Sequence, residues 1–260
     1  MKVLLINPPD VDSSLFDWAT AKRGRANNYP AYGLGVLARH LLNNGFEPEI
    51  LNLNHEVLKL VHAFDHPIDY DEVWKFILTT KVALFKPDFI GVTCLFSVTG
   101  KSLVNVCKFL RSITQAPIAI GGVHVTHDVD SILNETEADM AFLNESENAF
   151  IQYLKGEGLS QVVLKNGEKH LDKVLPTEAE LDVIPPFEMM DVENHSLYGT
   201  LGSWYGFRYK DTRIATALSN RGCRAHCSFC NVRSFNGVGV RQRSINSVLD
   251  ELSILKDRGI

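Results

Sequence analysis

The chain alternates short apolar runs with amphipathic helical patterns from Met1 to Lys155, and this alternation restricts the fold more than any other feature. The apolar runs that we expect to form strands are Lys2–Asn7, Glu47–Leu53, Asp88–Cys94, Pro117–Gly121 and Asp139–Leu143. Such near-continuous apolar runs are typical of parallel strands buried on both faces. The pattern therefore predicts an α/β domain built on a doubly wound parallel sheet, with helices on both faces.

The segments between these runs repeat apolar residues at spacings of three and four, which is the period of a helix. The clearest examples are Gly33–Asn44, Ser97–Ser112 and Glu145–Lys155. The first of them stops at Gly45, a residue type that favours the turn at a helix C-terminus. Leu58–Lys86 is long for a single crossover. Because proline breaks a helix, we expect Pro67 to divide it into a short helix and a longer one over Asp71–Phe85.

Beyond Lys155 the pattern changes twice. Gln161–Leu171 places Asn166-Gly167 between two β-type runs, which predicts a hairpin because both residues tolerate a positive φ. From Val174 to Tyr209 no period is sustained, and proline, aromatic residues and glycine punctuate the chain as in a linker. We therefore expect an α/β domain over 1–172 closed by the hairpin, a linker over 173–211 and a last unit over 212–260.

The last unit is expected to be a single βα unit. Its predicted strand is Thr212–Ser219, followed by a loop and a helix from Ile245 to Arg258. Ser244 precedes this helix as a candidate N-cap and Gly259 follows it as a stop. The apolar face of the helix is made by Ile245, Val248, Leu249, Leu252 and Leu255.

Charge and hydropathy disfavour several classes of protein. The chain has 26 basic and 31 acidic residues, a net charge of −5 and no long basic stripe, so nucleic-acid binding is not favoured. No apolar run approaches the roughly 20 residues of a membrane span. The run in MKVLLINPPD meets two prolines too early for a signal peptide and is interpreted as a buried first strand.

The five cysteines do not form a disulfide framework. Cys94 and Cys107 stand apart inside apolar stretches, where a cysteine is most often a small buried hydrophobic residue. The other three lie close together in the sequence, a spacing that is not typical of disulfide pairs. This usage is typical of a reducing compartment, and we expect a cytoplasmic protein.

The crowded cysteines are Cys223, Cys227 and Cys230, with a C-x3-C-x2-C spacing. Thiolates bind soft metals and iron–sulfur clusters, and three of them on one loop can hold three irons of a cubane. The fourth iron then lacks a protein thiolate, so a substrate or cofactor can coordinate it. The spacing indicates a cluster used for chemistry rather than for electron storage.

This loop resembles that of the radical S-adenosylmethionine superfamily, whose signature has the same spacing and an aromatic residue before the last cysteine, where Phe229 stands. The continuation RQRSINSVLDELSILKDRGI is similar to the first barrel helix of these enzymes. The resemblance implies that Cys223, Cys227 and Cys230 ligate a [4Fe-4S] cluster and that Phe229 lies near the adenine of S-adenosylmethionine. It further implies radical chemistry of the methyl-transfer or cyclisation type, on an unknown small-molecule substrate, with a reducing electron donor.

The loops after the predicted strands carry a second resemblance. Ligands of an open parallel sheet bind beyond the carboxyl ends of its strands, where small residues let a bulky group approach. The N-P-P start, the Gly-Gly-x-His-x-Thr turn and the acidic turn after the fifth strand resemble the flavodoxin-like cobalamin-binding domain that precedes many radical S-adenosylmethionine barrels. The resemblance implies cobalamin as a cofactor, with candidate contacts at Pro8, Pro9, Ser97, Thr99, Gly121, Gly122, His124, Thr126 and Glu145.

Two departures from that family pattern bear on the cofactor. The Asp-x-His-x-x-Gly element is absent from the first loop, so cobalamin is expected without a histidine on its lower face. The fifth turn reads Asn144-Glu145-Ser146-Glu147 instead of Gly-Glu-Gly-Glu.

Several candidates also have structural explanations. A histidine in a strand-to-helix turn is most often hydrogen-bonded, so His124 is expected to pack or to contact the nucleotide tail rather than to ligate cobalt. Gly121 and Gly122 can serve a tight turn. Glu145 and Glu147 favour the dipole of the following helix, and no catalytic residue is assigned. The histidines that we expect to be structural are His40, His55, His62, His66 and His195.

Two other functions remain open. The range 212–260 supplies one βα unit where a radical S-adenosylmethionine barrel repeats it, so we expect a fragment, an early-terminated product or a domain that a partner chain completes. One alternative is a cobalamin-binding module with a vestigial cluster loop. The other is a zinc-stabilised regulatory domain that uses the three cysteines and His226. Zinc is less favoured because no cysteine or histidine follows Cys230 to supply a second ligand pair.

Overall fold

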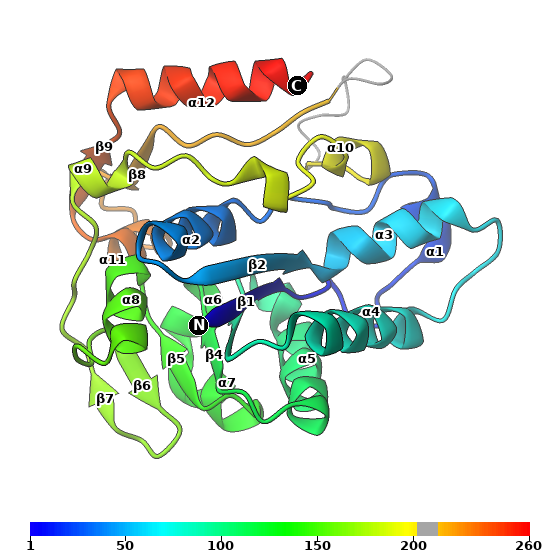
Figure 1. Cartoon of the computed structure of the whole chain (residues 1–260), viewed down its shortest axis with the longest axis horizontal. Helices are drawn as coiled ribbons and strands as arrows, with labels where there is room; N and C mark the ends of the chain where they lie inside the picture. Colours follow the sequence, from blue (N-terminus) through cyan, green and yellow to red (C-terminus); the bar gives the residue numbers. More distant parts are fainter. Residues whose placement is uncertain (202–212) are drawn as a thin grey trace.

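A computed structural model describes residues 1–201 and 213–260 (Figure 1). Its main sheet has the order β2-β1-β3-β4-β5-β6-β7. The strands are β1 (Lys2–Asn7), β2 (Glu47–Asn52), β3 (Phe89–Thr93), β4 (Ile118–Gly121), β5 (Met140–Phe142), β6 (Val162–Leu164) and β7 (Lys169–His170). β1 to β5 pair in parallel, and their order is that of flavodoxin-like sheets. All five predicted strands are confirmed.

The predicted hairpin is also confirmed. β6 and β7 are antiparallel, and β6 pairs antiparallel with β5, so the hairpin extends the parallel sheet at that edge. Gly167 has φ 91°, a left-handed conformation that glycine adopts without strain. The Asn166-Gly167 signal therefore located the turn correctly.

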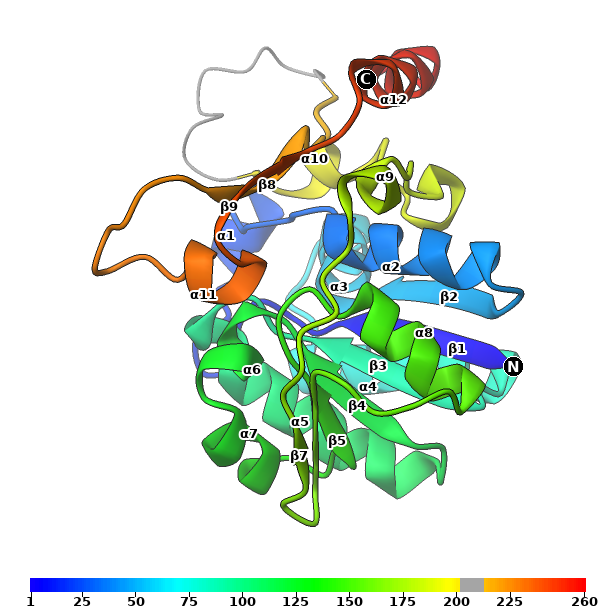
Figure 2. The same cartoon turned by 90° about the vertical axis from the view of Figure 1, so that its left-hand side faces the viewer.

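Helices cover both faces of the sheet, as the doubly wound pattern predicts (Figure 2). Strand β1 shows why: Leu4 and Ile6 point into one core with the helices α3 (Leu53–Ala63), α4 (Tyr70–Phe85), α5 (Gly100–Ile113) and α7 (Val129–Glu135). Val3 and Leu5 point into the other core, with α2 (Tyr32–Asn43) and α8 (Glu147–Lys155). Alternate residues of one strand thus serve two cores.

Helix boundaries differ from the predicted ones where a polar cap decides them. α3 begins at Leu53, earlier than the expected Leu58, because the Asn52 side chain accepts a hydrogen bond from the His55 N–H and starts the helix directly after β2. The expected helix Ser97–Ser112 is divided into a 3₁₀ turn, η1 (Ser97–Thr99), and α5. The short helices α1 (Trp18–Lys22) and α6 (Val123–His127) were not predicted.

Cys94 and Cys107 are buried, as expected for small hydrophobic residues. Burial raises the pKa of the Cys94 thiol to about 12 and raises that of Cys107 further. Both thiols are therefore protonated and unreactive at neutral pH.

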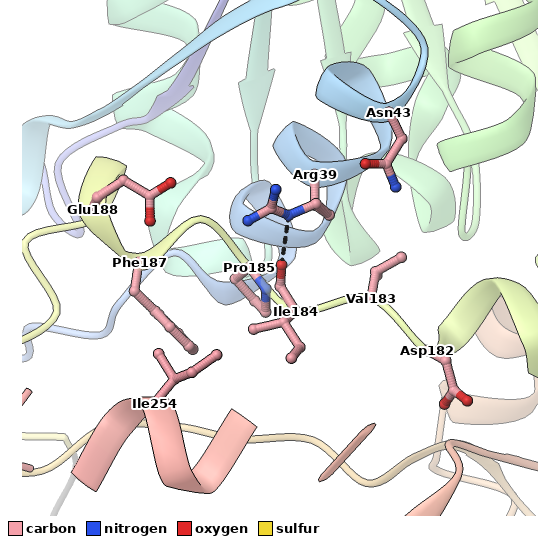
Figure 3. Close-up of a pocket in the computed structure, with 9 residues that line it drawn as sticks. All are labelled: Arg39, Asn43, Asp182, Val183, Ile184, Pro185, Phe187, Glu188 and Ile254. Atoms are coloured by element: carbon pink, nitrogen blue, oxygen red, sulfur yellow. Dashed lines mark hydrogen bonds between the residues drawn. The ribbon is translucent and has the colours of Figure 1, made fainter. Parts of the chain in front are cut away.

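The predicted linker is packed rather than extended in solvent. It forms α9 (Glu178–Leu181), a 3₁₀ turn η2 (Phe187–Met189) and α10 (His195–Tyr198). Phe187, Met190 and Val192 of this segment pack with Leu255 near the chain end into a third core. A hollow of about 390 Å³ lies alongside, where Arg39 of α2 donates a hydrogen bond to the Ile184 carbonyl at 2.8 Å (Figure 3). The part of the linker over 202–211 lies outside the described residues.

The expected strand Thr212–Ser219 is wrong for the residues that the structure describes. Residues 213–218 form no strand, and Thr212 lies outside the described range. A strand needs a neighbour for its backbone hydrogen bonds, and no strand of the described chain lies beside this segment. The chain instead forms an antiparallel pair, β8 (Asn220–Cys223) with β9 (Gly239–Gln242), on either side of the cysteine loop and α11 (Val232–Asn236).

The last helix, α12 (Ile245–Asp257), agrees with the predicted one. Ser244 is its N-cap and accepts a hydrogen bond from the Ser247 N–H at 3.2 Å. Among the described residues, no helix is both long enough and apolar enough to cross a membrane.

Candidate functional site

A cavity of about 520 Å³ lies at the carboxyl ends of β3, β4 and β5. Its apolar wall combines strand residues with the inner faces of α2 and α8, including Leu34, Ala119, Phe142 and Phe150. Its opposite wall is made by residues of β8, by Thr216 and Leu218 before it and by the end of α11. The cavity therefore lies between the parallel sheet and the segment that carries the cysteines, two parts of the chain that sequence reasoning treated separately.

Glycines bring the backbone close to this cavity. Gly122 has φ 109°, and a Cβ added there would lie 2.5 Å from the Cys94 carbonyl oxygen. Only glycine fits where the turn after β4 approaches the end of β3 so closely. Gly91, on the cavity wall, would place a Cβ 3.1 Å from the Leu5 side chain. The Gly121-Gly122 pair thus lets the turn after β4 lie close to the end of β3 and also leaves space in the cavity.

Three of the predicted cofactor contacts line the cavity: Gly121, Gly122 and Glu145. The predicted contacts that lie outside its lining are Pro8, Pro9, Ser97, Thr99, His124 and Thr126. All of these residues follow the carboxyl ends of strands, but His124 and Thr126 lie in the short helix α6 rather than in a loop. The sequence did not resolve which of them face the cavity, and their contact with cobalamin stays a prediction.

Thr126 and His124 make structural hydrogen bonds from the short helix α6. The Thr126 hydroxyl donates to the Gly122 carbonyl at 3.0 Å and accepts from the Asn144 N–H at 2.9 Å, which ties the turn after β4 to the turn after β5. The His124 N–H donates to the Cys94 carbonyl at 3.2 Å. These hydrogen bonds give Thr126 a structural role, and its expected contact with cobalamin stays a prediction.

Asp10 is a residue that sequence reasoning missed. It directly follows Pro8-Pro9, and burial raises the pKa of its carboxyl to about 6. The sequence gives no sign of this raised pKa, because the burial of Asp10 comes from parts of the chain that folding packs around it.

The acidic turn makes a buried ion-pair network with the hairpin. Arg221 contacts Glu145 at 2.7 Å and Glu147 at 2.6 Å. The other oxygen of Glu145 accepts from Arg241 and, at 2.6 Å, from the Asn236 amide. Buried charges persist when they are paired in this way. The partners lie more than 70 residues away in sequence, so the expected dipole role of these carboxylates was the only one visible in the sequence.

One oxygen of this network is left without a partner. Glu147 Oε2 is buried and accepts no hydrogen bond within the described chain. An ionised oxygen in that position costs free energy unless a donor reaches it. Glu147 itself is among the residues that line the cavity.

The three candidate metal ligands lie on an accessible loop. Cys223 ends β8 and is half-buried, whereas Cys227 and Cys230 are exposed, and all three are free thiols. The Ala225 N–H donates to the Cys223 sulfur at 3.4 Å. Phe229 is 88% exposed, so its expected place near an adenine stays a prediction.

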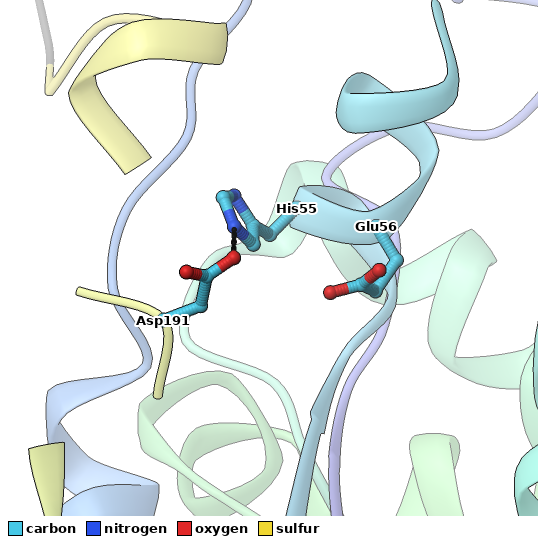
Figure 4. Close-up of side chains that lie close together, drawn as sticks. All are labelled: His55, Glu56 and Asp191. Atoms are coloured by element: carbon cyan, nitrogen blue, oxygen red, sulfur yellow. Dashed lines mark hydrogen bonds and ion pairs between the residues drawn. The ribbon is translucent and has the colours of Figure 1, made fainter. Parts of the chain in front are cut away.

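The cysteine sulfurs are not arranged as a zinc tripod. Tetrahedral zinc with Zn–S bonds of about 2.3 Å requires sulfurs roughly 4 Å apart. Among the described residues, the group of three potential ligands that lies within 4.8 Å is His55, Glu56 and Asp191 (Figure 4). That group belongs to a different part of the fold.

The arrangement around His55 is structural. Lys59 lies between the two carboxylates, 3.1 Å from Glu56 and 3.1 Å from Asp191, and already supplies the positive charge that a metal would bring. The Asn28 amide donates to His55 Nδ1 at 3.0 Å, so Nε2 carries the proton and donates to Asp191. A protonated Nε2 has no lone pair for a metal.

His195 stacks on His55, with ring centroids 3.8 Å apart. Its Nδ1 lies 3.1 Å from the Asp191 carbonyl oxygen and must donate to it, while Nε2 accepts from Asn52 at 3.2 Å. Burial, and then the neighbouring His55, lower the pKa of His195 to about 3. These two histidines were expected to be structural, but the stack that fixes the linker to the first turn of α3 was not foreseen.

Comparison with known proteins identifies the parallel-sheet part. The family model described as the B12 binding domain matches residues 22–154, just over half of the chain. The chain belongs to the B12-binding domain family. The cavity, the glycine turn and the acidic turn of this B12-binding domain protein all lie at the carboxyl edge where the resemblance placed the cofactor.

Two curated relatives of this B12-binding domain protein are named as methyltransferases. Cytidylyl-2-hydroxyethylphosphonate methyltransferase of Streptomyces wedmorensis is 26% identical over 98% of this chain and 52% of its own length. An uncharacterized methyltransferase of Pyrococcus horikoshii is 24% identical over 98% of this chain and 50% of its own. The chain thus spans about half the length of these relatives.

Solved structures share the fold across the whole chain. The radical S-adenosylmethionine methyltransferase TsrM of Kitasatospora setae, with cobalamin and a [4Fe-4S] cluster bound, superimposes with a TM-score of 0.68 at 20% identity. The match covers 100% of this chain and 47% of TsrM. A second TsrM structure, with tryptophan and a S-adenosylmethionine analogue bound, gives 0.66 at 20% identity and covers 100% of this chain and 46% of TsrM. The B12-binding domain and the segment with the cysteines therefore both belong to one known architecture.

Proposed function

We propose that this chain forms the cobalamin and cluster end of a radical S-adenosylmethionine methyltransferase. The cavity carries this proposal: one wall is the carboxyl edge of the B12-binding sheet and the other includes strand β8, which ends in Cys223. The methyltransferase names of the relatives favour methyl transfer over cyclisation. The substrate is a small molecule of unknown identity.

The residues at the cavity fit cobalamin. A volume of about 520 Å³ is in the range for a ligand of ordinary drug size, so we assign it to the nucleotide tail rather than to the whole corrin. Gly91, Gly121 and Gly122 let the tail approach the backbone, and Glu147 Oε2 can accept from an amide of the cofactor.

The donor set of the loop fits an open-iron cluster. Cys223, Cys227 and Cys230 offer three free thiols on one loop. When bound, the cluster and S-adenosylmethionine supply one-electron chemistry, and cobalamin supplies a carrier for the methyl group. A reducing electron donor is then required, which agrees with a cytoplasmic location.

In this proposal the chain's own residues bind and orient the cofactors and shield them from water. The glycine turns shape the cavity, the apolar wall from α2 and α8 excludes water, and Arg221 and Arg241 fix the hairpin. We keep the division into 1–172, 173–211 and 212–260 as part of the proposal. Turnover is proposed for the assembled protein, because the chain spans about half of its relatives.

The first test is anaerobic reconstitution with iron, sulfide and cobalamin, followed by low-temperature EPR of the reduced protein with and without S-adenosylmethionine. A cubane signal that shifts with S-adenosylmethionine, together with retained cobalamin, supports the proposal. Retained cobalamin without a cluster would indicate the binding module with a vestigial loop. One zinc per chain in a colourless protein would indicate the zinc-stabilised domain.

A further inference from the structure

Arg221 and Arg241 lie directly opposite each other in the antiparallel β8–β9 pair. Residues in this relationship project from the same face of a hairpin, and like charges placed so are destabilising without a counter-charge. Here the counter-charge comes from outside the hairpin, because the Glu145 carboxylate accepts hydrogen bonds from both guanidinium groups. The hairpin therefore depends on a residue of the B12-binding domain for its own electrostatic balance.

Glu145 also holds the other stem of the cysteine loop. Its Oε1 accepts from Asn236, the last residue of α11, at 2.6 Å. Arg241 in turn donates to the Asn236 carbonyl at 2.8 Å and to the Pro176 carbonyl. The loop leaves β8 at Cys223, two residues after Arg221, and enters α11 soon after Cys230. One carboxylate thus fastens both ends of the segment that carries all three cysteines.

The carboxylate is nearly inaccessible, since only 2% of the Glu145 side chain is exposed. Each of its oxygens already has an arginine partner. Two arginines face two glutamates, because Glu147 is the second partner of Arg221, so the network is balanced in charge. Such a site has little capacity left for a ligand on Glu145, in contrast to the free oxygen of Glu147.

We propose that Glu145 is a positioning residue that clamps the cysteine loop against the cofactor cavity, rather than a residue that contacts cobalamin through its carboxylate. The acidic turn after β5 then sets the distance and orientation between the cluster on the cysteine loop and the cobalamin at the edge of the sheet. This inference rests on the proposed function. It assigns to the acidic turn a role in joining the two cofactor sites.

The test compares Glu145→Gln with Glu193→Gln. Glutamine keeps the shape of the side chain and removes the charge. Glu193 pairs with Arg258 at the end of α12, so its variant also loses an ion pair to the C-terminal segment but leaves the cysteine loop untouched. Hydrogen exchange over 220–242 is measured in the cofactor-free chain. Protection is expected to be lost in Glu145→Gln alone.

A second readout uses the loaded protein. With reduced cluster and cob(II)alamin both present, the magnetic interaction between them is measured by EPR. We expect Glu145→Gln to keep each separate signal and to lose or alter their interaction, an outcome that a general loss of stability does not produce. Should Glu145→Gln fail to fold, Arg241→Lys takes its place, because lysine keeps the charge but cannot reach Glu145, Pro176 and Asn236 together.

The outcomes separate the two proposals. Unchanged hydrogen exchange and unchanged magnetic interaction in Glu145→Gln would overturn the clamp while the proposed function stands. A wild-type chain that binds neither cobalamin nor a cluster would overturn the proposed function. Equal loss of protection in Glu145→Gln and Glu193→Gln would also overturn the clamp, since any ion pair to this segment would then have the same effect.

Discussion

Arg243 and Glu251 form an ion pair in which both partners are buried, with 5% and 0% of their side chains exposed. The Tyr32 hydroxyl donates to the same carboxylate at 2.9 Å, and Arg243 also donates to the Leu218 carbonyl. This pair links β9 to α12 and both to α2 of the B12-binding domain.

Glu251→Gln is expected to destabilise the chain strongly. Removing one partner of a buried pair leaves an uncompensated charge, which costs about 3–5 kcal/mol of unfolding free energy. Denaturant unfolding measures the change, and Asp250→Asn on the exposed face of the same helix is the control. A loss no larger than that of the control would show that the pair contributes little.

Stability is expected to fall as the pH drops below about 6.5. His195 has an ordinary pKa of 6.5 in the unfolded chain but about 3 in the folded one, because of burial and then His55, so between these values the unfolded chain binds the extra proton. The full contribution is present above pH 6.5, and about 2 kcal/mol is lost between pH 7 and 5. The pKa of His55 is lowered as well, chiefly by burial, so His55 also makes the folded chain less stable as the pH falls.

Chemical unfolding at several pH values measures this dependence. His195→Gln is expected to flatten the slope, since glutamine does not titrate, whereas His66→Gln on the surface should keep it. A variant without His195 that keeps the full wild-type slope would contradict the assignment.

Gly122→Ala is expected to destabilise the fold by about 2 kcal/mol or more and to reduce cobalamin binding. The residue has φ 109°, and the new Cβ would lie 2.5 Å from the Cys94 carbonyl oxygen, so the turn after β4 must move. Thermal unfolding and cobalamin absorbance measure the two effects. Gly33→Ala, where nothing lies within 4 Å of the new Cβ, should leave stability unchanged or slightly higher.

Cys227→Ala is expected to abolish the cluster signal and to leave cobalamin binding intact. Cys227 is exposed on the loop and does not line the cavity. No cysteine is among the described residues that do, so the substitution leaves the cavity unchanged. Iron content and EPR measure the loss. Cys107→Ala, at a buried thiol in the main core, should keep the iron and lose about 1 kcal/mol of stability.

Glu147→Gln is expected to weaken cobalamin binding by roughly tenfold, which corresponds to about 1.4 kcal/mol. The change removes the charge from the one buried oxygen of the cavity wall that lacks a partner. Titration of the cofactor followed by absorbance measures the affinity. The control is Glu180→Gln, which alters a carboxylate on α9 outside the cavity lining. An equal loss of cobalamin affinity in both variants would contradict the assignment of Glu147 to the binding site.

The sequence by itself determined the parallel sheet, because a strand buried on both faces must be apolar throughout and β1 to β5 all show that pattern. It also determined the hairpin turn at Asn166-Gly167, since backbone conformation there depends on local residue type. The cysteine spacing and the glycine turn were recognisable for the same reason: each is a local requirement of geometry or of ligand chemistry.

Only the tertiary structure decided how the two cofactor regions meet. The strand expected at Thr212–Ser219 is replaced over the described residues by the β8–β9 pair, because strand pairing depends on which neighbour is available and not on local pattern. The partners of Glu145 are Arg221 and Arg241, and the stack of His55 on His195 joins residues that are still further apart in the chain. Ion pairs and ring contacts of this kind leave no periodic signal, because they depend on side chains that folding brings together from separate elements.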